Sequence, residues 1–560
     1  MTSRQEGLGD GSLSHIGSCG SDTLVRQASS IVHPSQTAVR ISAKLSSMTP
    51  QALAVALGDF LSVSSSAVVM EDGAIVFDLA QSKYSILGEN NKCLLHLWSS
   101  ERNVVRRVLD LETKGETLRV TVQRIGHAKP TRLEICRERD RRTASAKKQA
   151  RLAYSHMLER ALNRKFPDLT LVQLNTSMDL EKSFGPIYAR GLLKRGQSAF
   201  AVLGVNRQEL QSSIDSSLTF GILWLNVCRE AHAGKMVVAG LKLFVPAKSS
   251  ELVRARMAHL NPSAAKWQLY ELEERSDEIT EIEVFDRGNV STRLVRCVDE
   301  SEVERRFAEP IALVRTLMPE AEVARLSSAE VAFRCHGLEF ARSRLTAQPG
   351  RFHSEPEIVF GLGAEEKVLD GGNFGHLERL VRSIGEARHA GGPHDNRFWR
   401  LHPERWLESL VVRDICALDD GLDPRWCYSQ VPAFSASDRA MIDVLTATRA
   451  GRLAVVELKA DEDIHLPLQG VDYWSRVAWH HARGEFQKFG YFAGRELSSD
   501  SPLLMMVAPA LRVHPATDTL LRYISPEIEW MLLGIDERWR EKLRVVFRKR
   551  PETIQLKTAV

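Results

Sequence analysis

Short runs of apolar residues that alternate with polar ones dominate the chain between residues 45 and 145. Residues 68–77 contain two short apolar runs on either side of an Asp-Gly turn, which is a hairpin signal, and the segments 94–98 and 118–122 add further strands. Before them, residues 1–44 are rich in Ser and Gly and show no sustained period. We therefore predict a disordered tail over 1–44 and a small β-rich domain over 45–145.

The next part of the chain combines two periods. Residues 150–165 have helical spacing, whereas 200–205 and 237–245 are continuous apolar runs of the kind that buried strands have. This mixture predicts an α/β domain over 146–330. From 331 to 400 the sequence is Gly-rich and lacks a sustained period, so we predict an irregular connecting region there.

The last part of the chain, residues 401–560, has the most regular succession of elements. An amphipathic helix begins at Pro403, where proline and acidic side chains favour the first turn. The segments that follow are an edge strand at 428–434, a hairpin of 442–445 and 453–459, a helix near 468–474, and strands at 503–509 and 528–533. This order predicts an αβββαβ core, and we expect the whole chain to be a multi-domain α/β protein.

The second strand of the hairpin ends in charged residues, which is unusual for a buried strand. Apolar residues 453–456 lead directly into Glu457-Leu458-Lys459. Because side chains alternate along a strand, Glu457 and Lys459 share one face and lie roughly 7 Å apart. Asp443 stands on the neighbouring strand, and an unpartnered acid between buried strands would be costly. We therefore interpret these side chains as a cation site and not as a surface ion pair.

Six features in a fixed order extend this pattern beyond a single motif. They are Glu404-x-x-Leu407-Glu408, Gly421-Leu422, Gln430, Ile442-Asp443, a strand ending in Glu457-Leu458-Lys459, and Gln469-x-x-x-Tyr473. In this order they resemble the PD-(D/E)XK nucleases, which have the restriction-endonuclease-like fold. Within that superfamily they are similar to the C-terminal nuclease domain of NucS-type endonucleases. The resemblance covers residues 400–535.

The resemblance implies hydrolysis of DNA phosphodiester bonds at a Mg²⁺ or Mn²⁺ centre in a nuclease domain over 401–560. Asp443 and Glu457 would be the side-chain ligands, with the carbonyl of Leu458 as the third. Oxygen ligands of this kind suit both cations, and two carboxylates leave positions for water and phosphate.

The same resemblance implies roles for the catalytic residues around the metal. Lys459 would either lose its proton near the dication or orient the attacking water and stabilise charge on the phosphate. Gln469 would position that water or the lysine. Either Glu404 or Glu408, one helical turn apart, would reach a metal-bound water, and both remain candidates.

Residues around the hairpin suit contact with nucleic acid. The candidates are Gln430, Arg439, Tyr473 and Arg476. Basic side chains bind phosphates, and aromatic rings stack on bases. The alternative is a solvated helix face with aromatic residues in the core.

Residues 150–246 show a faint parallel to the last domain. A helix with Glu159, an apolar strand at 201–205 and a helix with Gln211 follow one another, but the Ile-Asp and Glu-x-Lys pairs are missing. The segment is either a second copy of the fold that has lost its metal ligands or an unrelated α/β domain.

Composition narrows the class of protein only slightly. The formal charge of +4 is mild, so a case for nucleic acid must rest on local patches. Eight cysteines without a CxxC pair argue against a zinc site or a disulfide framework and suit a reducing compartment. The sequence has neither a secretory signal nor an apolar run long enough for a membrane span. We expect a cytoplasmic protein.

These observations together predict a metal-dependent endonuclease that acts on double-stranded or branched DNA, without a membrane partner, as a monomer or a homodimer. The alternative is a non-catalytic nucleic-acid-binding or sensor protein that retains the nuclease fold. A third reading is an RNA nuclease.

Overall fold

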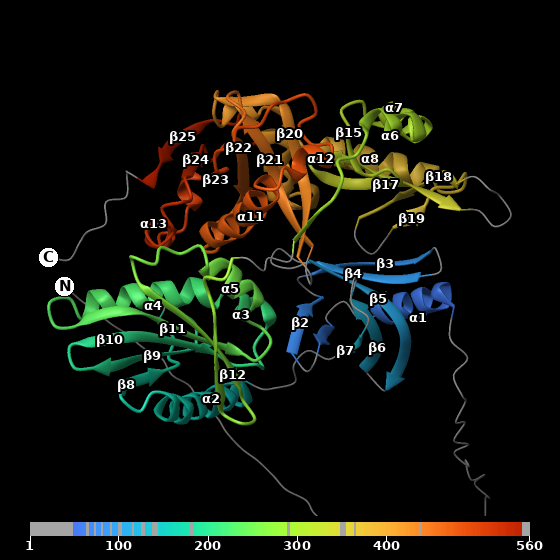
Figure 1. Ribbon diagram of the computed structural model, residues 1–560. Helices are drawn as coiled ribbons and strands as arrows, with labels where there is room; N and C mark the ends of the chain where they lie inside the picture. Colours follow the sequence, from blue (N-terminus) through green and yellow to red (C-terminus); the bar gives the residue numbers. More distant parts are fainter. Residues whose placement is uncertain are drawn as a thin grey trace, which may run out of the picture. The chain divides into compact units, whose positions relative to one another are not determined.

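The computed structural model describes residues 49–551. It leaves out 63–66, 72–73, 80–81, 90–91, 99–102, 115–116, 125–128, 137–143, 180–183, 288–291, 348–353, 363–365 and 436–438. The predicted tail at 1–44 therefore lies outside the described residues. The described residues form four β-sheets with helices packed on them (Figure 1). The prediction of a mixed α/β chain is confirmed.

The first sheet falls within the range that alternation predicted to be β-rich. Its described strands are β1 (Val68–Glu71), β2 (Ala74–Asp78), β3 (Lys83–Glu89), β4 (Lys92–Trp98), β5 (Asn103–Lys114), β6 (Thr117–Arg124) and β7 (Pro130–Cys136). They pair antiparallel in the order β2-β1-β7-β6-β5-β4-β3. Helix α1 (Pro50–Ser62) packs on this sheet and buries Leu57 against apolar residues such as Leu95.

The middle sheet has helices on both faces (Figure 1). Its described strands are β8 (Thr170–Asn175), β9 (Tyr188–Arg195), β10 (Ser198–Val205), β11 (Val237–Pro246), β12 (Lys266–Glu273) and β13 (Glu278–Ile282). The helices are α2 (Ala144–Lys165), α3 (Gln211–Asp215), α4 (Ser217–Ala231) and α5 (Glu251–Met257). Val202 of β10 packs in the core under α2, whereas Leu203 packs in the core under α4. Burial of both faces explains the continuous apolar run at this strand.

Residues 322–368 form a further sheet that the sequence did not predict. Its described strands are β15 (Glu322–Ser327), β16 (Glu330–Cys335), β17 (Leu338–Ala347), β18 (Ser354–Phe360) and β19 (Lys367–Val368). The associated helices are α6 (Glu300–Arg306), α7 (Ala308–Leu317), α8 (Phe374–Ala387) and α9 (Arg397–Arg400). A shared core of buried residues such as Phe333, Phe340 and Ile384 joins the sheet to α8. The prediction of an irregular region over 331–400 is therefore wrong.

The hairpin of β16 and β17 shows why this sheet is hard to recognise. Its turn is His336-Gly337, and both residues have positive φ, 45° and 71°. Such a two-residue turn matches the twist of the strands, but a His-Gly pair is a weak turn signal. A side chain at Gly337 would place its Cβ 2.0 Å from the carbonyl oxygen of Arg405. Glycine therefore allows this turn to lie against the helix that carries Arg405.

The C-terminal sheet carries the predicted site. Its described strands are β14 (Thr292–Leu294), β20 (Leu422–Ser435), β21 (Arg439–Thr448), β22 (Leu453–Leu458), β23 (Leu503–Pro509), β24 (Trp530–Ile535) and β25 (Val545–Lys549). The helices are α10 (Pro403–Arg413), α11 (Leu466–His481), α12 (Glu485–Lys488) and α13 (Thr517–Leu521), with short 3₁₀ turns η1 (Ile415–Ala417) and η2 (Ala510–Arg512). The order α10-β20-β21-β22-α11-β23 agrees with the predicted αβββαβ succession.

The strand expected at the edge of this sheet is not an edge strand. β20 pairs with β21 on one side and with β14 on the other, where Thr292 stands opposite Ser435 and Leu294 opposite Ala433. Three residues from within the predicted 146–330 domain therefore complete the C-terminal sheet. Such a short pairing, distant in sequence, has no local signal.

The middle and C-terminal sheets repeat one topology. The strand order is β8 to β13 in the first and β20 to β25 in the second, each in sequence order. In both, the first three strands pair antiparallel, the next two pairings are parallel and the last is antiparallel. Each copy inserts a long helix after its third strand and a short one after its fourth. The faint sequence parallel over 150–246 therefore reflects a shared strand order.

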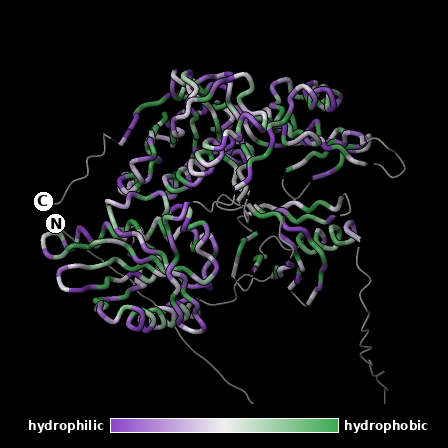
Figure 2. Tube along the Cα trace, viewed as in Figure 1, coloured by the Kyte–Doolittle hydropathy of each residue, from purple (hydrophilic) through white to green (hydrophobic). Residues whose placement is uncertain are grey.

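Hydrophobic residues lie along the buried strands. Hydrophobic stretches run along the strands of the middle sheet (Figure 2), where all residues from Ala201 to Val205 are buried. None of the described helices combines the length and the apolar character needed to cross a lipid bilayer.

Candidate functional site

The candidate site lies on the antiparallel hairpin of β21 and β22. Val444 pairs with Val456, which sets Asp443 beside the end of β22. The Oδ2 atom of Asp443 accepts the backbone N–H of Leu458 at 2.9 Å. This hydrogen bond holds the Asp443 carboxylate against the strand that carries Glu457. The structure thus brings together the two acids that the sequence singled out.

Glu457 and Lys459 form a buried ion pair at the end of β22. The Lys459 Nζ donates to Oε1 of Glu457 at 3.0 Å, and the two residues are only 5% and 1% exposed. Oε2 of Glu457 is buried without a hydrogen-bond partner in the part of the chain that the structure describes. Burial, reinforced by the charge of Asp443, raises the pKa of the Glu457 carboxyl well above its usual value despite the lysine. Glu457 therefore has a carboxylate oxygen without a hydrogen bond, and the positive charge of Lys459 does not fully compensate for the burial of its negative charge.

The ammonium group of Lys459 is strongly held in its charged form. Burial opposes the charge, but Glu457, Glu404, Asp443 and Asp463 outweigh that effect and raise the lysine pKa well above its usual value. Asp463 lies 3.9 Å from the Nζ atom and follows β22 in the turn before α11. In this environment Lys459 is a hydrogen-bond donor and not a base. The sequence reasoning missed Asp463, because an acidic turn is most often a solvated surface.

Helix α10 supplies two acids that play different parts. Glu408 is 5% exposed, and its Oε2 accepts Nη1 of Arg405 at 2.9 Å. Glu404 is half-buried, and burial raises its pKa while Lys459 acts in the opposite direction. Among nearby charges, Lys459 affects the pKa of Glu404 most, whereas Arg405, which is hydrogen-bonded to Glu408, affects the pKa of Glu408 most. Of the two acids of α10, Glu404 is therefore the one that interacts more with Lys459.

Gln430 links α10 to the hairpin. Its Nε2 donates to Oε2 of Glu408 at 2.8 Å and to Oδ1 of Asp443 at 3.4 Å. The backbone of Gln430 has a φ of 52°, a left-handed conformation that few residues other than glycine adopt. Strain of this kind persists only where neighbours hold it, and here it directs the amide between two acids. Gln430, which the sequence predicts to contact nucleic acid, is hydrogen-bonded to two acids of the site.

Helix α11 packs on β22 and β23 and carries three further predicted residues. Gln469 lies buried in its first turn, and Tyr473 follows four residues later. Burial raises the pKa of Tyr473 well above its usual value, and the charges of Glu457 and Asp443 add to the shift. Tyr473 is therefore close to both acids. It lies half-buried at the rim of the site.

Of the other two predicted nucleic-acid contacts, the structure describes the side chain of Arg476 alone. Arg476 is buried and pairs with Asp472 at 3.1 Å on its own helix. It is therefore directed at α11 and not at an open surface. Arg439 begins β21, but its side chain lies outside the described residues.

The charges of this cluster favour a positive ligand. Its carboxyl groups are those of Glu404, Asp443, Glu457 and Asp463, and they surround the ammonium of Lys459. Glu457 forms a buried floor, while Glu404, Asp443 and Asp463 are half-buried and reach solvent. The unsatisfied Oε2 of Glu457 and the raised pKa of its carboxyl fit an oxygen ligand for a divalent cation.

Such a cation would depend on more than side chains. No group of three or more His, Cys, Asp and Glu side chains among the described residues is arranged to hold a metal ion. Asp443 and Glu457 could hold one only together with backbone or water oxygens. Mg²⁺ is commonly bound in this way, by one or two carboxylates and several waters.

Comparisons of the sequence with models of known protein families and with curated proteins find no match.

Proposed function

We propose that the C-terminal part of this chain is a metal-dependent deoxyribonuclease of the PD-(D/E)XK type. One observation carries the proposal. Asp443 and the Glu457-Lys459 pair come from adjacent strands to one cluster, where an oxygen of Glu457 is buried and unsatisfied. The order α10-β20-β21-β22-α11-β23 supports it, since the resemblance to these nucleases rests on motifs in the same order.

In the proposed reaction, a water oxygen bonds to phosphorus and the bond from phosphorus to one sugar oxygen breaks. The water proton passes to solvent, the leaving oxygen takes up a proton, and the products are a phosphate monoester and a hydroxyl. A bound Mg²⁺ or Mn²⁺ would neutralise phosphate charge and make water more acidic. Asp443, Glu457 and the Leu458 carbonyl would hold it.

The remaining residues have roles that follow from their contacts. Lys459, kept protonated by its acidic neighbours, donates hydrogen bonds to the phosphate oxygens as negative charge develops. Glu404 holds a water at the half-buried rim. Glu408 is a positioning residue, because it acts through Gln430 on Asp443. Gln469 and Tyr473 close the side of the site that α11 forms.

The test is cleavage of double-stranded DNA, branched DNA and RNA by the full chain, with Mg²⁺, with Mn²⁺ and with a chelator. The proposal predicts cutting of DNA that the chelator abolishes. Asp443→Asn and Lys459→Met should lose cutting, whereas Glu541→Gln, which removes an exposed acid that is not one of the site residues, should not.

Two outcomes would contradict the proposal. Cutting of RNA alone would assign the site to a ribonuclease. Binding of DNA without cutting under any of these conditions would indicate the non-catalytic alternative, in which the fold is kept as a binding surface.

A further inference from the structure

The middle and C-terminal copies of this topology contact each other through corresponding helices. Helix α4 of the middle copy packs against α13 of the C-terminal copy, and α11 of the C-terminal copy packs against α5 of the middle copy. By position after the third and fourth strands, α4 corresponds to α11 and α5 to α13. The long helix of each copy therefore packs against the short helix of the other copy. Such reciprocal contacts between corresponding helices indicate an approximate two-fold axis between the copies.

A short bridge lies on this axis. Leu260, three residues after the end of α5, pairs antiparallel with Ile524, three residues after the end of α13. On either side, Asn261 N–H donates to the Tyr523 carbonyl at 2.8 Å, and the Ser525 N–H donates to the carbonyl of His259 at 2.9 Å. Corresponding residues thus contact one another, as at the axis of a homodimer.

The two candidate site positions lie on the same side of this contact. In each copy the third strand leads towards the long helix, β10 to α4 and β22 to α11. The beginnings of those helices meet, because Thr219 Oγ1 and His465 Nδ1 share a hydrogen bond of 3.1 Å. Leu468 of α11 also packs in the core under α4. The two long helices therefore begin beside each other at this contact.

The strand ladders show what stands at the site position of the middle copy. Pro246 ends β11 and Pro509 ends β23, and three residues earlier Leu243 and Met506 are equivalent. Leu243 pairs with Leu203 of β10, and Met506 pairs with Glu457 of β22. Leucine thus stands in the middle copy where glutamate stands in the C-terminal copy.

The second acid and the lysine are replaced as well. Leu203 pairs with Arg190 of β9, whereas Glu457 lies across from Asp443 of β21. Two residues after Leu203 comes Val205, at the position of Lys459. The middle copy therefore has an arginine, a leucine and a valine in place of an aspartate, a glutamate and a lysine.

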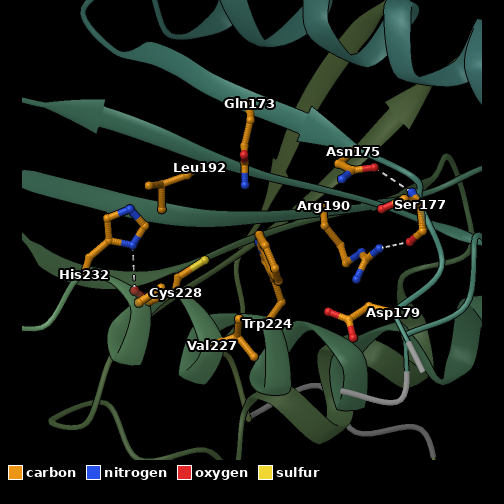
Figure 3. A pocket seen from close by; sticks show the side chains of 11 residues that line it. Gln173, Asn175, Ser177, Asp179, Arg190, Leu192, Trp224, Val227, Cys228 and His232 are labelled. Carbon is orange, nitrogen blue, oxygen red and sulfur yellow. Dashed lines mark hydrogen bonds between the residues drawn. The ribbon is translucent and has the colours of Figure 1, made fainter. Parts of the chain in front are cut away.

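The surroundings of Arg190 exclude a divalent cation there. Figure 3 shows its guanidinium beside Ser177 and Asp179. These residues line a cavity of about 250 Å³. Arg190 is 3% exposed, donates to the Ser177 carbonyl, and lies with Cζ 4.5 Å from the centroid of the Phe184 ring and 5.6 Å from that of Trp224. A fixed positive charge in this place repels a metal ion.

We infer that this chain is a covalently joined pseudo-dimer with a single cutting centre, which breaks one strand of a duplex in each binding event. The inference rests on the proposed function. The two backbones of a duplex are related by local two-fold axes, so a pseudo-two-fold protein presents comparable positions to both strands. Only the position with Asp443, Glu457 and Lys459 can hydrolyse; the other contacts its strand without cutting it.

The experiment follows supercoiled plasmid under excess of the full chain with Mg²⁺ or Mn²⁺, separating supercoiled, nicked and linear forms over time. The inference predicts that nicked circles accumulate first and that linear DNA appears only after a lag. Asp443→Asn should abolish the nicking.

The outcomes separate this inference from the proposed function. Linear DNA that forms without a lag from the start would overturn the single cutting centre while leaving the nuclease proposal intact. A complete absence of breaks with the wild-type chain would refute both.

Discussion

Divalent cations should stabilise this protein against unfolding, and the effect should depend on Glu457. The Oε2 atom of this residue is buried without a hydrogen-bond partner in the described structure, and burial raises the pKa of its carboxyl. A cation that binds the folded site relieves both conditions. Since the unfolded chain has no such site, binding energy appears as stability.

The size of the effect follows from mass action. At a cation concentration ten times the dissociation constant, stabilisation is RT ln 11, about 1.4 kcal/mol. For a unit of 150–250 residues this corresponds to a rise in Tm of about 3–6 °C. Glu457→Gln keeps the shape of the side chain but removes the charge that a cation needs, so the rise should disappear.

The assay is thermal unfolding, followed by fluorescence, of the wild type, Glu457→Gln and Glu541→Gln across a titration of Mg²⁺ and Mn²⁺. Glu541→Gln makes the same charge change at an exposed position and should keep the full shift. Equal shifts in all three proteins would refute the reasoning, because the cation would then bind elsewhere. The readout does not depend on whether the protein cuts DNA.

Three further outcomes are expected. Gln430→Ala should slow single-turnover DNA cleavage about tenfold or more, since the amide aligns Glu408 with Asp443; an unchanged rate would contradict that role. Gly337→Ala should lower the free energy of unfolding by more than about 1 kcal/mol in a urea titration, because its φ is 71° and a Cβ would meet the helix that carries the site acids. Burial, with Arg287 as a lesser cause, lowers the pKa of His259 to about 4, so the unfolded chain binds the extra proton as pH falls below about 6.5. Stability should therefore drop by about 2 kcal/mol from pH 7 to pH 5 on account of this residue, and His259→Gln should remove that part of the pH dependence.

Local patterns in the sequence predicted the elements that local interactions decide. The hairpin of β21 and β22 was predicted because its apolar run and short turn are contiguous. The spacing that placed Glu457 and Lys459 on one face follows from the alternation of a single strand. The convergence of these residues with Asp443 needs only one antiparallel pairing.

Features that depend on distant contacts were not predicted. β14 adds three residues to β20 from more than 100 positions away in the chain, and no local period marks it. The sheet of β15–β19 was missed because His336-Gly337 is a weak turn signal. Arg476 was predicted to contact phosphate, but its partner Asp472 lies four residues before it on the same helix face. The spacing of four residues between Asp472 and Arg476 is the sequence signal of this ion pair.

Inside the site, sequence reasoning found the acids but not the links between them. Arg405 donates a hydrogen bond to Glu408, and this contact distinguishes Glu408 from Glu404. The spacing of the two acids on the helix does not distinguish them. The left-handed backbone of Gln430 has no sequence signature, because glutamine rarely adopts it.

The most direct test of the central claim is the single-turnover rate of DNA cleavage by Glu457→Gln beside the wild type, with both proteins folded and both able to bind DNA. We predict metal-dependent cleavage by the wild type and none by the variant. Cleavage at the wild-type rate by Glu457→Gln would show that the hydrolytic centre lies elsewhere in the chain.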